Sequence, residues 1–250
     1  MNPLFKVTIF ALIAGAATAV AETGRFPVME RLRVKSQQMP VYPLEMVRLG
    51  AREGKVVVAL SVDTKGQLED LLVIAHTHPD FADAAVAALR RWTFEPATLG
   101  GTPVAAVTEI TIDFAVEGTS VVSMTPSDTL AAYFYSIHQA KDTYRPHTLH
   151  ELDRIPTPIA APGPQYPREL ADRGRSGDVT VHFFIDEKGS VRIPSIDNTN
   201  DAELGSLAIL ALRQWKFEPP TCKGVPVLVK ASQVFRFRPA AAGVTRAAGD

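Results

Sequence analysis

The strongest constraint on the fold of this chain is a segment that occurs twice, once in each half. The first copy reads LRRWTFEPATLGGTPV and the second reads LRQWKFEPPTCKGVPV. In a chain of 250 residues, which is long enough for two small domains, such a repeat indicates two structural units of the same kind. We therefore expect two homologous domains with separate cores.

Two spacings give the alignment of the copies. Tyr42 and Tyr166 are 166 − 42 = 124 residues apart, whereas Trp92 and Trp215 are 215 − 92 = 123 apart, so the second copy is one residue shorter between these points. The difference falls where the segments GAREG and GRSG align, and a surface loop accommodates such a change easily. After this loop the copies stay in register.

Each copy contains a strand followed by a tight turn. KVVVALSVD and DVTVHFFID alternate between two faces, which is the pattern of a half-buried strand. DTKG and DEKG follow, with Asp at the first turn position and Gly at the fourth, so each strand is expected to turn into a hairpin. Pro194 lies in the second return strand and lacks a backbone donor, which predicts an edge position or a bulge.

A helix and a final strand complete each copy. Thr77 with Asp80, and Asn200 with Glu203, form the capping pattern of a helix start. The apolar face of each helix ends at one of the two Trp residues, which are expected to anchor the cores rather than to bind a ligand. The predicted class is α+β, with two tandem domains. Each has a short helix, a β-hairpin, a second helix and a third strand, so that a three-stranded antiparallel sheet packs on helices.

The order of the motifs adds a family resemblance. Tyr-Pro, Gly-x-Val-x-Val, Asp-x-Lys-Gly, Trp-x-Phe-x-Pro and Gly-x-Pro-Val follow one another in both copies, and the whole constellation resembles the TonB C-terminal domain family. The residues that carry the resemblance and define the fold are Tyr42, Pro43, Trp92, Phe94, Pro96, Tyr166, Pro167, Trp215, Phe217 and Pro219.

The resemblance implies a function as well as a fold. Domains of this family are periplasmic binding modules of Gram-negative bacteria that make strand contacts with outer-membrane transporters. The expectation is therefore a non-enzymatic protein that binds partner peptides or proteins of the cell envelope by strand addition and is linked to TonB-dependent outer-membrane transport. No cofactor, no nucleic acid and no small-molecule substrate is expected.

The N-terminus has the features of a secretory signal. A short segment ending at Lys6 is followed by an apolar run from Val7, with small residues at Ala19 and Ala21. Cleavage after Ala21 is expected, which places the mature protein in the periplasm. The alternative is an uncleaved helix that anchors a TonB-type energy transducer in the inner membrane. The apolar run is short for a span, and no His occurs in residues 1–21, whereas the family's transducers have one there.

These observations divide the chain into five parts. The segment TPSDTLAAYFYSIHQAKDTYRP has an apolar stripe and is predicted to be an amphipathic connecting helix, followed by a Pro-rich linker. The predicted parts are a signal peptide at 1–21, a first domain at 38–117, the connecting helix and linker at 118–157, a second domain at 158–240, and a disordered tail at 241–250.

Chemistry-bearing motifs are few. His76, His78 and Asp80 lie within five residues in HTHPD and offer the one hypothesis of a metal-dependent enzyme. The second copy has TNDAE at this place, without His, so a surface loop explains the cluster better and no metal site is predicted. Nucleophile elbows, phosphate-binding glycine loops and zinc helices do not occur in the sequence. Cys222 is the only cysteine and has no assigned role.

The final strands are the candidates for partner binding, because an open strand edge accepts an extended peptide. Polar residues alternate with apolar ones there, acidic in the first copy and basic in the second, which predicts two distinct partners or one bipartite partner. Self-association through the same edges is a further hypothesis. The candidate residues are Glu109, Thr111, Asp113, Val234, Arg236 and Arg238.

Overall fold

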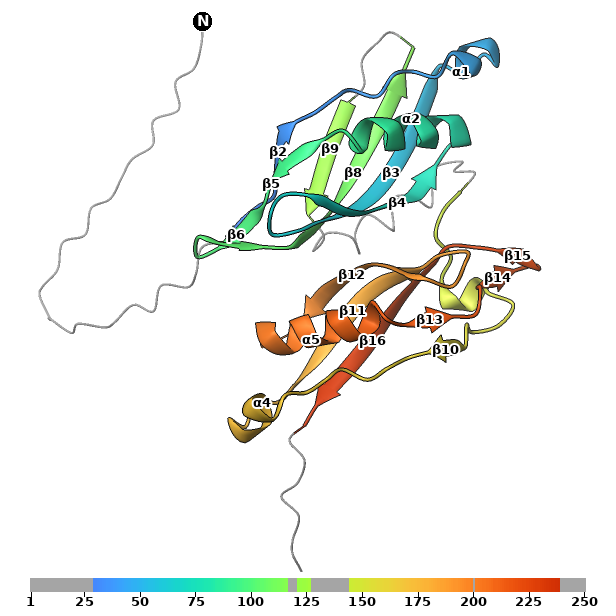
Figure 1. The fold of residues 1–250 in the computed structure, drawn as a ribbon. Coiled ribbons are helices and arrows are strands. Elements are labelled where there is room, and N and C mark those ends of the chain that lie inside the picture. The colour runs from blue at the N-terminus through green and yellow to red at the C-terminus, as the bar shows by residue number, and fades with distance from the viewer. Residues whose placement is uncertain (1–28, 117–120, 127–143, 200, 239–250) are drawn as a thin grey trace, which may run out of the picture.

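The computed structural model describes residues 29–116, 121–126, 144–199 and 201–238 (Figure 1). The predicted signal peptide, the predicted tail at 241–250 and most of the predicted connecting helix lie outside these residues. None of the helices within the described ranges is long and apolar enough to cross a membrane. Figure 1 shows two units of the same build, with α2 lying across the sheet of the first and α5 across the sheet of the second.

The first unit is built around a four-stranded antiparallel sheet of order β4-β3-β8-β9. Strand β2 lies upstream of residue 38 and pairs with β5, so the strand pairing of this unit starts earlier than the predicted boundary. Its elements are β1 (Met29–Glu30), β2 (Arg33–Ser36), α1 (Leu44–Arg48), β3 (Glu53–Val62), β4 (Leu68–His76), α2 (Pro79–Leu89), β5 (Thr93–Glu95), β6 (Ala97–Leu99), β7 (Thr102–Val104), β8 (Ala106–Ala115) and β9 (Val121–Pro126).

The second unit has a three-stranded antiparallel sheet of order β12-β11-β16. A 3₁₀ turn in the linker, η2 (Leu149–Glu151), precedes it. Its elements are β10 (Pro158–Ala160), α4 (Arg168–Asp172), β11 (Gly177–Ile185), β12 (Val191–Asn198), α5 (Ala202–Leu212), β13 (Lys216–Phe217), β14 (Thr221–Cys222), β15 (Val225–Pro226) and β16 (Val229–Phe237). The predicted α+β class and element order are confirmed in both units. The three-stranded sheet is confirmed in the second, and the first has β9 in addition.

The hairpin turns form as their sequences predict. In the first unit the backbone N–H groups of Lys65 and Gln67 donate to Asp63 Oδ1, each at 2.8 Å. In the second, Asp186 Oδ1 accepts from the backbone N–H of Ser190 at 2.8 Å. Gly189 has a φ of 76°, a conformation that glycine adopts without strain. The Asp and Gly of the turn motif therefore fix the connection between the first two strands of each sheet.

Each sheet packs against its long helix through a separate core. Trp92 is only 4% exposed, and its Nε1–H donates to the carbonyl of Gln38 at 2.9 Å. Trp215 packs at the border of the second core, and its Nε1–H donates to the carbonyl of Pro162 at 3.0 Å. The two Trp residues thus tie the segment before the short helix to the end of the long helix.

The predicted helix starts are wrong by one residue. The residue before α2 is His78, whose side chain accepts from the backbone N–H of Asp80, while the Thr77 hydroxyl accepts from Lys55 N at 3.0 Å. The residue before α5 is Asp201, whose carboxylate accepts from two backbone N–H groups of the first turn. The capping pattern located the helices, but a residue directly beside each predicted cap makes the capping bond.

Two further expectations about the first unit are corrected by the strand arrangement. Strand β3 is buried on both faces over most of its length rather than half-buried, because one face packs on α2 and the other belongs to an interdomain cluster. Thr125 and Pro126, predicted as the start of the connecting helix, belong to strand β9 instead.

The position of Pro194 is as predicted. It lies in β12, an edge strand, and the pairing of β12 with β11 shifts register between the partners of His182 and Phe184. Ile193, at this irregularity, has a φ of 47°, which is unfavourable for a β-branched residue. Its side chain is buried in the interdomain cluster, and this burial offsets the backbone strain.

The faces of the two sheets that α2 and α5 leave uncovered meet at a junction between the units. Its apolar centre contains Val57, Ala59, Leu72, Ile74, Ala75, Phe184, Ile193 and Leu228. At the rim of this centre, Arg192 Nε of β12 donates to Asp70 Oδ2 at 2.9 Å. Arg213, directly after α5, donates from Nη2 to Glu69 Oε2 at 2.7 Å, so both arginines bind β4.

Candidate partner-binding edge

Strand β16 forms one border of the second sheet. It pairs with β11 from Gly177 opposite Phe237 to Ile185 opposite Val229. Within the described ranges its other side has backbone–backbone bonds only at the start, where Lys230 N donates to His147 O at 3.1 Å and His147 N donates to Leu228 O at 2.7 Å. Further along, Val234 O accepts a bond from the Gln233 side chain at 2.9 Å. No other strand within the described residues pairs with this side.

The alternation of backbone groups along a strand identifies the residues that present this open side. In an antiparallel pair, the N–H and C=O of one residue point to the same side, and successive residues alternate. Because Lys230 N points away from β11, the backbone groups of Ser232, Val234 and Arg236 point outward with it. Two of the three predicted candidates on this strand, Val234 and Arg236, therefore lie on the open edge with exposed side chains.

The third candidate, Arg238, lies just beyond the strand. Its Nη2 donates to Asp178 Oδ1 at 2.6 Å, so it is tied to the neighbouring strand β11. Arg236 pairs with Asp178 in register but lies outside ion-pair distance of any acidic group that the structure describes. The guanidinium of Arg238 is thus bound to the sheet, whereas that of Arg236 points to solvent.

The corresponding strand of the first domain, β8, is not an edge. Strand β9 pairs with it from Asp113 opposite Val121 to Thr108 opposite Pro126, so the expectation of an open final strand is wrong for the first domain. Glu109 is only 2% exposed and Thr111 is buried as well. Asp113 is half-buried, with a carboxylate oxygen 3.9 Å from Lys55 Nζ. The chain itself therefore occupies the place that we assigned to a partner.

Glu109 has an unusual environment. Neither carboxylate oxygen has a hydrogen-bond partner among the described residues. Burial raises the pKa of Glu109 to about 7, although the charge of Lys230 on β16 acts in the opposite direction. Burial also lowers the pKa of Lys230. An acidic group of the first domain and a basic group of the second thus interact across the junction.

The three residues of the HTHPD segment do not converge on one point. The ring of His76 stacks on Tyr144 with 5.0 Å between centroids, and His78 caps α2 beside Asp80. Among the residues that the structure describes, no group of three or more His, Cys, Asp and Glu side chains is placed to hold a metal ion. The segment shapes the helix start and the contact with the linker.

Two parts of this region were missed in the sequence. The segment VVSMTP, which forms β9, is rich in β-branched residues, and this signal could have indicated a strand. His147 lies in the predicted linker, where its backbone extends the pairing of β16 and its Nδ1 is buried. No sequence pattern marks His147, because its position depends on the packing of the linker.

Comparison with known proteins places the fold in a family. The family model described as Gram-negative bacterial TonB protein C-terminal matches this chain twice, at residues 38–116 and 162–239. The chain belongs to the TonB C-terminal family. Each match covers one of the two units, so the protein is a tandem pair of TonB C-terminal domains.

Two similar proteins come from the same family. Over 76 residues the chain is 32% identical to Protein TonB of Vibrio cholerae, and this match covers 30% of the chain and 31% of the relative. The chain therefore spans about a third of the length of that relative. A solution NMR structure of the Pseudomonas aeruginosa TonB CTD is 27% identical, with a TM-score of 0.32, over 37% of this chain and 92% of that one.

The TonB C-terminal motif residues have structural roles in both domains. The Tyr42 hydroxyl donates to the carbonyl of Ala51 at 2.8 Å and thereby closes the loop after α1. In the second domain the Tyr166 hydroxyl donates to the carbonyl of Arg175, at the equivalent loop. The one-residue difference between the copies falls within these loops, and the same bond closes both.

Proposed function

We propose that this protein is a non-enzymatic periplasmic member of the TonB family that binds an extended segment of a cell-envelope protein by strand addition. Outer-membrane transporters of the TonB-dependent class are the proposed partners, because the family to which the chain belongs suggests them. The binding place is the outward side of β16 in the second domain, and the first domain supports it across the junction.

One observation carries this proposal. The same strand position is covered by the chain's own β9 in the first domain, whereas in the second no strand among the described residues pairs with it beyond Lys230. An exposed row of backbone N–H and C=O groups favours pairing with another strand, and main-chain bonds then supply much of the affinity. β16 is nine residues long, which is sufficient for several such bonds.

The test is a peptide titration monitored at backbone amides. Peptides from the N-terminal regions of TonB-dependent transporters are added to the full chain, and amide shifts and hydrogen exchange are followed by NMR. The expected result is slower exchange at Ser232 and Val234, whose N–H groups would enter new bonds. Shifts confined to other surfaces, with unchanged exchange along β16, would contradict the proposal.

A matched pair of variants separates strand addition from side-chain binding. Val234→Pro removes an outward donor of the edge, whereas Val234→Thr keeps the backbone group and the β-branched shape. We expect the proline variant to lose peptide binding and the threonine variant to keep it. Thermal unfolding of both variants shows whether the second domain remains folded.

Localisation is tested separately. We propose that the segment before Glu22 is removed and that the mature protein is periplasmic, as the sequence pattern of residues 1–21 suggests. The intact mass of the protein from fractionated cells is expected to lack these residues. A full-length mass in the inner-membrane fraction would instead favour an anchored TonB-type transducer.

A further inference from the structure

We propose that the outer surface of α1 in the first domain binds a second copy of this chain, whose own α1 packs against it in the antiparallel direction about a two-fold axis. This α1 surface consists of five apolar side chains on the helix and directly beside it. It lies on a different element from β16, so the inference does not depend on the proposed function. The members of the surface are Met39, Val41, Leu44, Val47 and Leu49.

The α1 surface is apolar and open to solvent. Leu44 is 77% exposed and Val41 is 76% exposed, and the other three members are between 43% and 65% exposed. The buried residue of α1 is Met46, so the helix is attached to the core through its opposite side. Single exposed apolar residues are common on protein surfaces, whereas several in one short segment mark a contact site. The α1 surface therefore has the character of a protein contact.

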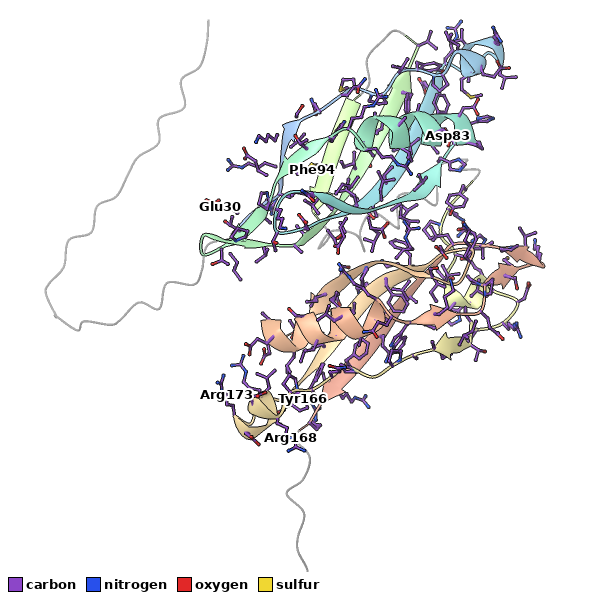
Figure 2. All side chains as sticks on the ribbon, in the orientation of Figure 1. Glu30, Asp83, Phe94, Tyr166, Arg168 and Arg173 are labelled. Carbon is purple, nitrogen blue, oxygen red and sulfur yellow. The ribbon has the colours of Figure 1, made fainter. Side chains whose placement is uncertain are left out.

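The second domain shows that the fold does not need these apolar residues. Its short helix α4 is attached to the core in the same way, through the buried residue Leu170. Arg168 stands at the place of Leu44, 168 − 44 = 124 positions further along the chain. Arg173 stands likewise at the place of Leu49, and Figure 2 shows both arginines at α4. The apolar surface is thus a property of the first domain alone, which a structural role would not explain.

The charges of α1 favour a second copy over a charged partner. The helix contains one acidic and one basic residue, and Arg48 Nη1 lies 3.2 Å from Glu45 Oε2. A helix that binds an anionic lipid surface is instead rich in Lys and Arg. In a two-fold contact the same patch serves both copies, so the patch must complement itself. A helix with balanced charges meets this condition.

An antiparallel register makes the α1 surface self-complementary. When the two-fold axis passes between the third and fourth residues of α1, Glu45 lies opposite the second copy's Arg48. Leu44 then lies opposite the second copy's Leu49, and Val47 lies beside its own counterpart at the axis. Two charge pairs thus flank an apolar centre. A parallel arrangement would instead set like charges against each other, which is unfavourable.

The size of the α1 surface agrees with a weak dimer. Five partly exposed Val, Leu and Met side chains present on the order of 500 Å² of apolar area, which is the size of a functional patch. A standard stable interface buries about 800 Å² per partner, so association requires raised concentration. Figure 1 shows α1 at the end of the first unit that lies away from the second unit. A second copy can therefore approach α1 without meeting the second domain.

Sedimentation velocity of the purified protein at several concentrations tests the association. The average mass is expected to rise from about one toward about two chain masses between roughly 1 µM and 500 µM, the range of a weak contact. Leu44→Arg and Leu49→Arg introduce residues that the second domain carries at these places, so both variants should fold. Each should raise the dissociation constant by about tenfold or more. Leu210→Arg makes the same change at an exposed position of α5 and should have no effect.

Two charge variants test the register. Glu45→Arg and Arg48→Glu each place like charges opposite one another in the antiparallel pair, and each should weaken self-association by about threefold to tenfold. Mixed in equal amounts, the two variants should associate more strongly than either one alone, because opposite charges then meet at both pairs. A loss of folding cannot produce this recovery. A mixture no stronger than the separate variants would overturn the antiparallel register.

The remaining outcomes decide the inference independently of the proposed function. A single chain mass over the whole concentration range would overturn it, and so would a dimer that survives both leucine substitutions. If the protein stays monomeric but binds vesicles of phosphatidylglycerol and phosphatidylethanolamine, and Leu44→Arg abolishes this binding, the α1 surface binds lipid instead and the inference is overturned. Peptide protection at Ser232 and Val234 is measured on Leu44→Arg as well, so strand addition at β16 can stand or fail separately.

Discussion

Replacement of Glu109 by Gln should change the pH dependence of stability in a defined direction. Burial raises the pKa of this carboxyl from 4.5 to about 7, so the folded protein holds the proton more tightly than the unfolded chain does. As the pH rises from about 4.5 to about 7, the Glu109 carboxyl ionises in the unfolded chain before it ionises in the folded protein, and the free energy of unfolding falls. The destabilisation is complete above the folded pKa and absent below the unfolded one.

The size of the effect follows from the shift. One pKa unit corresponds to 1.36 kcal/mol, so a difference of 7 − 4.5 gives a loss of about 3 kcal/mol at neutral pH. Glu109→Gln has no charge to bury and should lack this loss. The variant should therefore match the parent near pH 4.5 and exceed it by about 3 kcal/mol above pH 7, apart from a pH-independent offset for the buried amide.

Urea unfolding of both proteins between about pH 4.5 and 8.5 measures this difference. Asp113→Asn is the control, because Asp113 lies four residues further along β8 and is half-buried rather than enclosed. The pairing of Glu151 with Arg145 lowers the pKa of Glu151 to about 2. The contribution of Glu151 to stability is therefore lost at more acidic pH, outside the pH range of this experiment. A difference between parent and Glu109→Gln that stays constant with pH would refute the reasoning.

Three further substitutions test the contacts that hold the domains. Gly189→Ala should lower the free energy of unfolding by about 2 kcal/mol or more, because the new methyl group would meet the carbonyl of Phe217 at a positive φ. Gly174→Ala, which has a positive φ in open space, should lower it by about 1 kcal/mol. Urea unfolding measures both changes. Asp201→Ala removes the cap of α5 and should lower stability by about 1 kcal/mol, measured by thermal unfolding. Arg192→Leu removes the charged bonds between β12 and β4 and should cost about 2 kcal/mol, with faster amide exchange in β4.

The sequence predicted the local structure well, because repeated local signals determine it. The Asp and Gly of each turn act through bonds within four residues, and the apolar faces of the helices have a clear period. The helix starts were displaced by one residue because His78 and Asp201, directly beside the predicted caps, have the geometry that reaches the first-turn amides.

Long-range pairing explains what the sequence did not predict. That β9 covers β8, and that the second sheet packs behind β3, depends on contacts between distant segments with no local pattern. The candidate residues show this plainly. Val234 and Arg236 lie on an open edge, whereas Glu109, on the corresponding strand of the other copy, is enclosed because β9 pairs beside it and the junction is near.

The junction also explains why two homologous domains differ in their free surfaces. The first domain contributes residues such as Val57 and Ala59 from the middle of β3, whereas the second contributes Phe184 from the end of β11, so the two copies use different positions of the repeat. At the positions that correspond to Val57 and Ala59, the second domain has Thr180 and His182. His182 Nε2 lies 3.3 Å from Asp197 Oδ2.

A contact between two different surface patches can repeat from one domain to the next only if every domain carries both patches. Here the second domain has a polar patch at the place where the first is apolar, so extending the junction to another chain would bury His182 and Asp197 against apolar groups. The polar patch therefore disfavours extension of this junction to another chain. Among the described residues of this face, His182 is half-buried, Asp197 is exposed, and Ser232 of β16 lies opposite His182.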